Sequence, residues 1–579
     1  MSETIKQTGY PSKLRLHEKD ATFFQKYPVI PGCSIFSLIK YTSRKYRKEI
    51  AVEDVGKKIS FERLIENAQI LARSLYRIGL QKGDILTMVV PNCHQGIELF
   101  LAANSIGVIV TFLNSHATVQ EVERYLKMYG SSVLVKEKYT EEDKKLLCGE
   151  GNTRCIITLE QMPAQHAENA VISYESLSNR KSKGIQRSIG IKNCEAMILY
   201  TSGTTGNPKS VVLTNKNIIA TAIYLKNSSH VTQQSGEKSL VCVPFCYPYG
   251  FVTSVLMSLL CGRTVIIGPD ISKDTIADFY MQSPNIIFGS PALLELTMRN
   301  IPDNMDLSSV ETFISGGDFL NEQMAKRAIC FFREHNCKEV EIINGSGNAE
   351  TCGGNTNAYG CNVPFLSVGK PFYGVSAIVV NENMEELPYE QEGMLCISGK
   401  NVFKEYYGNP ELTRQSKFRY QGKEYFKTGT NGRLLLDGSF ELTGRSSRFY
   451  IISTLNKVYC DHVQMALNTI EGIESAAVVK HPDSKWLYVG HAFIILNDKT
   501  MTSERIIKEL QKERNVAMEK RAHCNLRVDK RYAEFKADVE KLADEINAAT
   551  ADYDRKNTFY KNAQNTADAL ERKHQAERW

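Results

Sequence analysis

The chain has 579 residues, of which 42% are hydrophobic, so it is long enough to form two or more domains with large cores. Its formal net charge of +6 is small, and basic residues are interspersed with acidic ones, which excludes the concentrated positive charge of a nucleic-acid-binding surface. No uninterrupted apolar run reaches about 18 residues, and residues 1–6 carry no signal-peptide core, so we expect no membrane span and a cytoplasmic location.

The cysteines and histidines suggest neither a disulfide framework nor a zinc site. The 15 cysteines are widely spaced and include no C-x-x-C pair, which is typical of reduced thiols. The 11 histidines form no H-x-x-x-H or H-E-x-x-H pair. The metal that we expect is therefore a Mg²⁺ ion that accompanies a nucleotide.

The first three quarters of the chain alternate short apolar runs with amphipathic helical stretches. This alternation predicts βαβ units and parallel sheets, and hence an α/β fold with a large N-terminal domain, residues 1–444. The apolar runs that we interpret as strands are residues 85–90, 131–135, 240–243, 265–268, 285–288 and 341–343.

The pattern changes from Arg445 onward. A helix near residues 462–470, strands at 475–480 and 490–496, and a helix from Ser503 predict a small α+β C-terminal domain, residues 445–530. Residues 531–579 contain neither Gly nor Pro, and apolar side chains recur there in steps of three and four, which predicts a helical tail. This tail could pack on its own domain, which we favour, or form a coiled coil or a homo-oligomer contact.

The decapeptide YTSGTTGNPK, residues 200–209, predicts a polyphosphate-binding loop between two buried strands. Lys209 supplies positive charge, while the loop offers hydroxyl donors and unhindered backbone amides from Thr201, Ser202, Gly203, Thr204, Thr205 and Gly206. The spacing does not fit a P-loop, since Pro208 stands where that motif has glycine, and the run 345–350 lacks the third glycine of a dinucleotide fingerprint. The alternative is a flexible polar loop.

Further motifs follow in a fixed order, and with them the chain resembles the adenylate-forming superfamily of acyl- and aryl-CoA synthetases, peptide-synthetase adenylation domains and luciferases. The resemblance covers roughly residues 30 to 510. The motifs that carry it, after the decapeptide, are VPFCYPYG (243–250), FISGGDFL (313–320), NGSGNAET (344–351), SVGKP (367–371), KTG (427–429) and LTGRSSRF (442–449).

The resemblance implies a reaction in which a carboxylate attacks ATP, with Mg²⁺, to give an acyl-adenylate and pyrophosphate. A thiol of CoA or of a carrier-protein phosphopantetheine then displaces AMP. Members that activate amino acids carry an aspartate in the segment aligned with residues 245–251, whereas this chain has FCYPYGF. We therefore expect a fatty or aryl acid as the substrate.

Site residues are carried over position by position. The resemblance assigns phosphate binding to residues 201–206, catalytic roles to Thr204, Lys209 and Glu350, and metal binding to Glu350 as well. Nucleotide contacts are implied for Gly316, Gly317, Ser346, Thr430 and Arg445. Tyr247, together with Tyr249 and Phe251, could line an acyl or aryl pocket, although aromatic residues here could equally belong to the core.

Several positions depart from the family pattern. Ser346 replaces an adenine-stacking aromatic residue, Ala349 replaces threonine, and Thr430 replaces an aspartate that accepts the ribose hydroxyls. The C-terminal catalytic lysine is matched only by Lys536, which a solvent-exposed position on the helical tail explains better. The second hypothesis is therefore a degenerate adenylate-forming fold that acts as a non-catalytic binding or scaffold protein.

Overall fold

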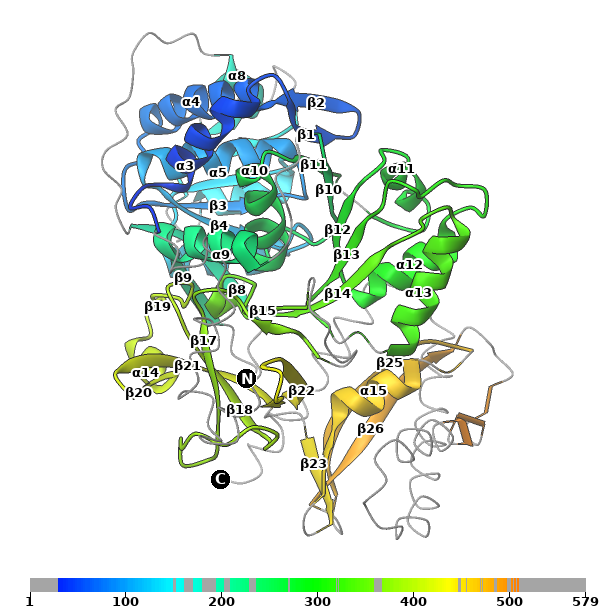
Figure 1. Ribbon diagram of the computed structural model, residues 1–579. Helices are drawn as coiled ribbons and strands as arrows, with labels where there is room; N and C mark the ends of the chain where they lie inside the picture. Colours follow the sequence, from blue (N-terminus) through cyan, green and yellow to red (C-terminus); the bar gives the residue numbers. More distant parts are fainter. Residues whose placement is uncertain are drawn as a thin grey trace. The chain divides into compact units, whose positions relative to one another are not determined.

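The computed structural model describes residues 30–148, 153–160, 170–179, 194–201, 209–228, 236–268, 271–318, 320, 322–358, 367–445, 449–453, 456–468, 470, 472–483, 487–496, 501–502, 505–506 and 508–509 (Figure 1). These residues fall into two compact units. The larger ends at Leu442 and the smaller begins at Thr443, with residues 429–431 grouped with the smaller unit. The predicted tail, 531–579, lies outside the described residues, and the division into three domains stays a prediction.

One sheet of the larger unit carries the two strands that flank the decapeptide. Among the described residues it has eight strands in the order β19-β9-β8-β4-β3-β5-β6-β7. The run from β8 to β7 is parallel, whereas β9 is antiparallel to β8 and β19 is antiparallel to β9. The bounds are β3 (Ile85–Val89), β4 (Ile109–Leu113), β5 (Val133–Lys136), β6 (Cys155–Thr158), β7 (Val171–Ser173), β8 (Glu195–Thr201), β9 (Lys209–Thr214) and β19 (Glu405–Tyr406).

A second sheet, with nine strands in the described part of the chain, has the order β16-β15-β14-β13-β12-β10-β11-β1-β2. Its centre, from β14 to β1, is parallel, and antiparallel strands close both edges. The bounds are β1 (Ile50–Asp54), β2 (Lys57–Ser60), β10 (Lys238–Val241), β11 (Thr264–Ile267), β12 (Ile286–Gly289), β13 (Thr312–Ser315), β14 (Glu341–Ser346), β15 (Thr356–Asn357) and β16 (Lys370–Pro371). The predicted α/β fold with parallel-rich sheets is confirmed.

Helices connect the parallel strands and cover the sheets (Figure 1). Local sequence defines their ends: Ser60 caps α4 by accepting a hydrogen bond from Arg63 N, and Thr118 and Glu121 form a capping box at the start of α6. The helices of this unit are α3 (Ile35–Thr42), α4 (Phe61–Arg77), α5 (His94–Ile106), α6 (Val119–Tyr129), α7 (Lys144–Cys148), α8 (Tyr174–Ser178), α9 (Asn215–Ser228), the π-helix η5 (Tyr249–Leu256), α10 (Met257–Leu260), α11 (Ile276–Tyr280), α12 (Pro291–Asn300), α13 (Glu322–Glu334) and α14 (Pro410–Gln415), with short 3₁₀ turns η2 (Ser43–Tyr46), η3 (Glu141–Asp143) and η6 (Ala349–Thr351).

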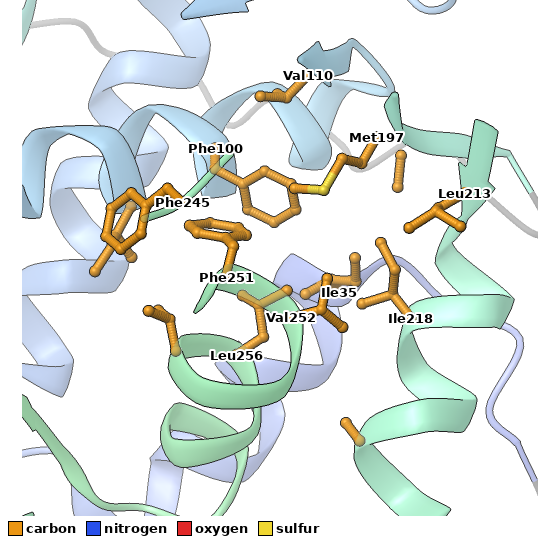
Figure 2. Close-up of a cluster of buried hydrophobic side chains, with 14 of the residues drawn as sticks. Ile35, Phe100, Val110, Met197, Leu213, Ile218, Phe245, Phe251, Val252 and Leu256 are labelled. Atoms are coloured by element: carbon orange, nitrogen blue, oxygen red, sulfur yellow. The ribbon is translucent and has the colours of Figure 1, made fainter. Parts of the chain in front are cut away.

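An aromatic cluster forms the centre of the largest hydrophobic core (Figure 2). The ring of Phe251, from η5, lies 4.6 Å from that of Phe100 and 4.8 Å from that of Phe112, measured between centroids. Phe245 packs edge-on against Phe251 at 5.1 Å. Such edge-to-face contacts stabilise a core beyond the burial of apolar area alone.

The remaining strands form smaller sheets. One of these sheets consists of β17 (Ser376–Val380), β18 (Gly393–Ser398), β20 (Lys417–Tyr420), β21 (Lys423–Leu434) and β22 (Phe440–Arg445). In it, β17 is antiparallel to β18 and β20 is antiparallel to β21. The smaller unit contains α15 (Cys460–Asn468), the hairpin of β23 (Phe449–Ser453) and β24 (Asn456–Tyr459), and the hairpin of β25 (Ile473–Asp483) and β26 (Leu487–Leu496). This unit has the α+β character that the sequence predicts. No helix in the described residues is long and apolar enough to cross a membrane.

Candidate active site

The strands on either side of the decapeptide form an antiparallel pair that brings its two ends together. Thr201 is the last residue of β8, Lys209 is the first of β9, and the two are register partners. The hydroxyl of Thr201 donates to the carbonyl oxygen of Lys209 at 3.5 Å. The buried strands expected on both sides of the loop are confirmed. Residues 202–208 lie outside the described residues, so phosphate binding by Ser202, Gly203, Thr204, Thr205 and Gly206 stays a prediction.

A lysine, a tyrosine and a glutamate meet beside this strand pair. Tyr406 lies in β19, which pairs with β9 and places Tyr406 opposite Val211. Its hydroxyl donates to Oε1 of Glu350 at 2.7 Å, and Nζ of Lys209 lies 5.5 Å from the centroid of its ring. Tyr406 is 3% exposed and Glu350 9%. Two of the predicted catalytic residues therefore contact the same tyrosine: Glu350 at its hydroxyl and Lys209 at its ring.

Burial and charge keep the Tyr406 hydroxyl protonated. Burial raises the pKa of Tyr406, and the neighbouring Glu350 carboxylate raises it further, because a phenolate beside a carboxylate would be repelled. The hydroxyl therefore acts as a donor to Glu350 over the whole physiological pH range. A hydrogen bond between a neutral donor and a buried carboxylate is worth about 1.5–3 kcal/mol.

The backbone around Glu350 is held by the segment that precedes β19. The amide of Phe403 donates to the Glu350 carbonyl oxygen at 2.7 Å, and the Phe403 ring lies 4.7 Å from that of Tyr406. Nζ of Lys417 donates to the carbonyl oxygens of Phe403 and Lys404, each at 3.0 Å. Burial lowers the pKa of Lys417. These contacts fix the position of the glutamate through strands that lie far from it in sequence.

Gly316 and Gly317, for which nucleotide contacts are predicted, directly follow β13. The amide of Gly316 donates to the Gly289 carbonyl oxygen at 3.0 Å, and Gly317 has φ of +83°, which favours glycine. A Cβ atom on Gly316 would lie 3.1 Å from the ring of Tyr249, so a larger residue would displace that ring. Ser346, at the end of β14, is held through its backbone amide, which donates to the Thr356 hydroxyl at 3.2 Å.

The three aromatic residues expected near the acid substrate have different environments. Tyr247 is 50% exposed. Tyr249 directs its hydroxyl to the Ile314 carbonyl oxygen at 2.6 Å, with Gly289 O at 3.2 Å, and burial raises its pKa. Phe251 is 0% exposed and belongs to the aromatic core shown in Figure 2, which is the alternative that the sequence left open. Of the three, Tyr247 has the most surface available to a ligand.

The remaining predicted site residues belong to the smaller unit or lie outside the described residues. Thr430 lies in β21 and Arg445 is the last residue of β22, and both are grouped with the smaller unit. Lys536 lies outside the described residues. The nucleotide and catalytic roles of all three stay predictions.

Tyr406 is the residue that sequence reasoning missed. It lies 56 positions from Glu350, and no local pattern links them. Its position depends on the pairing of the two-residue strand β19 with β9, which is a long-range contact. The signal that could have found it is the short motif EYYGNP around it, because Asn409 caps α14 and Pro410 begins it, which defines a turn directly after the strand.

Metal ions bind in proteins to particular sets of ligand side chains. The described residues contain no group of three or more His, Cys, Asp or Glu side chains that could hold a metal. Mg²⁺ usually binds through one or two protein carboxylates together with substrate phosphates. Glu350 therefore fits a Mg²⁺ ion that arrives with a nucleotide, and a preformed structural metal site is not part of the described structure.

Comparison with known sequences identifies the family. Residues 39–407 match the family described as AMP-binding enzyme. Because this match covers more than half of the chain, the chain belongs to the AMP-binding family of adenylate-forming enzymes, as its motifs predicted.

Individual relatives are distant. A long-chain-fatty-acid–CoA ligase of Bacillus subtilis (strain 168) is 26% identical over 494 residues, covering 81% of this chain and 86% of the ligase. Tyrocidine synthase 3 of Brevibacillus parabrevis is 24% identical over 77% of this chain, which spans 7% of that synthase. Among solved structures, the anthranilate CoA ligase AuaEII in complex with anthranoyl-AMP has a TM-score of 0.72 at 18% identity, covering 84% of this chain and 91% of the ligase. This structural likeness shows a shared fold.

Proposed function

We propose that the protein is an ATP-dependent acid–thiol ligase that activates a fatty or aryl acid as acyl-AMP and transfers the acyl group to CoA or to a carrier-protein thiol. The observation that carries this proposal is the cluster of Lys209, Tyr406 and Glu350 beside the strand pair that holds the decapeptide. A cation and a carboxylate, both positioned by one buried tyrosine, are the two charges that nucleotide binding with a divalent cation requires.

The first half-reaction makes mainly positional demands on the protein. The substrate carboxylate attacks the α-phosphorus of ATP, a P–O bond forms, and the bond to the departing pyrophosphate breaks. Lys209 would balance the negative charge on the phosphates, and the loop hydroxyls and amides of residues 201–206 would hold the departing group. Glu350 would hold Mg²⁺, which neutralises phosphate charge when it is bound. In the second half-reaction a thiol displaces AMP from the acyl carbonyl.

The acid class is inferred from the segment that follows β10. Residues 245–251 contain no carboxylate to pair with an amino group, which favours an acid without an α-amine. Tyr247 is half exposed there and offers an aromatic surface and a hydroxyl to an acyl or aryl group. The relatives include a fatty-acid ligase and a structure with a bound aryl adenylate, which agrees with both acid classes.

Pyrophosphate release by the purified full-length chain tests the proposal. ATP, Mg²⁺ and a panel of fatty, aryl and amino acids are supplied, with hydroxylamine to trap acyl-adenylates as hydroxamates. We expect release with a subset of the fatty or aryl acids, and its loss in Lys209→Met. Lys216→Met is the matched control, because Lys216 is exposed at the start of α9, close to Lys209 in sequence.

The opposite result would support the degenerate alternative. If no acid produces pyrophosphate and calorimetry detects no ATP binding to a folded protein, the altered positions Ser346, Ala349 and Thr430 have removed nucleotide binding. The chain would then be a binding protein built on the adenylate-forming fold.

A further inference from the structure

The tip of the β1–β2 hairpin has unusual backbone and surface properties. Asp54 and Lys57 are register partners, and Val55 and Gly56 form the two-residue turn between them. Val55 has φ of +42° and Gly56 has φ of +80°, as in a type I′ turn, where Asn-Gly is the common sequence. A β-branched residue with positive φ is an outlier, and Val55 is also 71% exposed. Strained, exposed positions of this kind are often found at functional sites.

Both ends of this turn contact the same histidine. His94 is the first residue of α5 and is 5% exposed. One carboxylate oxygen of Asp54, Oδ2, accepts the backbone N–H of His94 at 2.8 Å and lies 2.7 Å from its ring Nδ1. On the other side of the ring, Nε2 lies 2.8 Å from Nζ of Lys57. The order of groups is therefore lysine, histidine, aspartate.

Hydrogen-bond chemistry determines which of these groups donates and which accepts. A lysine ammonium has only donors, so Nε2 of His94 must accept. The ring proton then lies on Nδ1 and is donated to the buried carboxylate of Asp54, which is 9% exposed. A nucleophilic atom, a base within hydrogen-bond reach of it, and a carboxylate that orients the base together form the arrangement of an activated nucleophile.

We propose that Lys57 is a nucleophilic lysine, activated by His94 and Asp54, and that it is a site of N-acylation by small acyl thioesters. Lys57 is exposed, so an acyl donor can reach it from solvent. The exposed side chain of Val55, two positions earlier in the turn, offers apolar surface to the acyl group. This site is separate from Lys209, Tyr406 and Glu350 and requires no nucleotide.

The step balances without a further reactant. His94 Nε2 accepts one proton from the Lys57 ammonium, and the free amine attacks the thioester carbonyl. A C–N bond forms and the C–S bond breaks. The leaving thiolate takes the proton from His94, and the amide nitrogen releases its second proton to water. The products are an N-acyl-lysine, a thiol and one proton.

The neighbouring lysine provides an internal control. Lys58 lies on the same strand, and its side chain is 61% exposed, but its Nζ lies 3.4 Å from the Glu53 carboxylate rather than beside a base. A carboxylate holds an ammonium in its charged form, whereas an oriented imidazole can take its proton. If Lys57 merely makes a structural hydrogen bond to His94, the two lysines will react at similar rates.

The test treats the full-length protein with S-acetyl-N-acetylcysteamine and follows acetylation of Lys57 and Lys58 over time by peptide mass spectrometry. We expect Lys57 to react at least about tenfold faster, a conservative figure beside the 10²–10⁴-fold typical of general-base catalysis. In Asp54→Asn and His94→Gln the ratio of the two rates should fall towards one.

The ratio of the Lys57 and Lys58 acetylation rates in the wild-type protein tests the proposal even if a variant does not fold. A ratio near one in the wild-type protein would overturn the proposal. So would a high ratio that persists in folded Asp54→Asn, as judged by an unchanged circular dichroism spectrum. Because the thioester is supplied from solution, this result does not depend on the adenylation activity, and failure of one proposal leaves the other intact.

Discussion

Removal of the Tyr406 hydroxyl is the most direct test of the candidate active site. Tyr406→Phe keeps the ring that packs on Phe403 and faces Lys209, and it deletes the donor to Glu350. The Glu350 carboxylate, 9% exposed, would then lose a hydrogen bond worth about 1.5–3 kcal/mol. We expect the free energy of unfolding to fall by a value in that range.

The functional effect should be larger at low magnesium concentration. If Glu350 holds the metal, Tyr406 orients that ligand, and loss of such an orienting partner typically weakens metal binding about 10–100-fold. We expect the Mg²⁺ concentration for half-maximal pyrophosphate release to rise in Tyr406→Phe, with kcat at saturating Mg²⁺ less affected. The assay is pyrophosphate release over a series of Mg²⁺ concentrations at fixed ATP and acid.

Tyr389→Phe is a matched control for this substitution. Tyr389 is also buried, at 7% exposure, and within the described structure its hydroxyl has no hydrogen-bond partner. Its substitution should leave both stability and Mg²⁺ dependence close to those of the wild type. If Tyr406→Phe behaves like Tyr389→Phe in both measurements, Tyr406 does not position Glu350 and the reasoning is refuted.

Three further predictions address the loop lysine, the aromatic core and the tail. Lys209→Ala should lower the rate of pyrophosphate release at least about 100-fold, as expected for loss of a charge that acts on the transition state. Its melting temperature should be close to that of the control variant Lys216→Ala. Equal rates of pyrophosphate release in the two variants would remove Lys209 from the site. Phe251→Ala should lower the free energy of unfolding by about 3–5 kcal/mol in chemical denaturation, because Phe251 is fully buried among aromatic rings. Tyr247→Ala should lower it much less and should change the preference among acids. A larger loss of stability in Tyr247→Ala than in Phe251→Ala would contradict the assignment of Phe251 to the core. If residues 531–579 form a homo-oligomer contact rather than packing on their own domain, deletion of the residues after 542 should reduce the mass measured by light scattering. A monomeric mass for both forms would exclude the homo-oligomer contact.

Local patterns were sufficient for the fold class and for the strands that flank the decapeptide. The apolar runs at 85–90 and 341–343 correspond to β3, which is buried along its whole length, and to β14, which is buried at its centre. The runs before and after the decapeptide are likewise β8 and β9. Motif order, which is also a property of the sequence alone, placed the chain in its family.

Local sequence could not assign residues whose environment depends on distant strands. Tyr247, Tyr249 and Phe251 lie within one short aromatic segment, yet the first is half exposed and the last is in the core, because the backbone turns from a loop into the π-helix η5 between them. A sequence pattern shows that such residues are apolar but not which surface each one meets. Only packing against α5 and β4 assigned Phe251 to the core.

The sequence by itself determined the family and the succession of strands and helices that makes an adenylate-forming fold. It also predicted the side chains for the chemistry, the hydroxyl-rich loop with Lys209 and the carboxylate of Glu350. The tertiary structure decided which side chains act together. Tyr406 reaches Glu350 because β19 adds to the edge of β9, and Lys57 reaches His94 because a hairpin turn brings it level with Asp54. Hydrogen bonds act over about 3 Å, so such partnerships exist only after strand pairing has brought distant parts of the chain together.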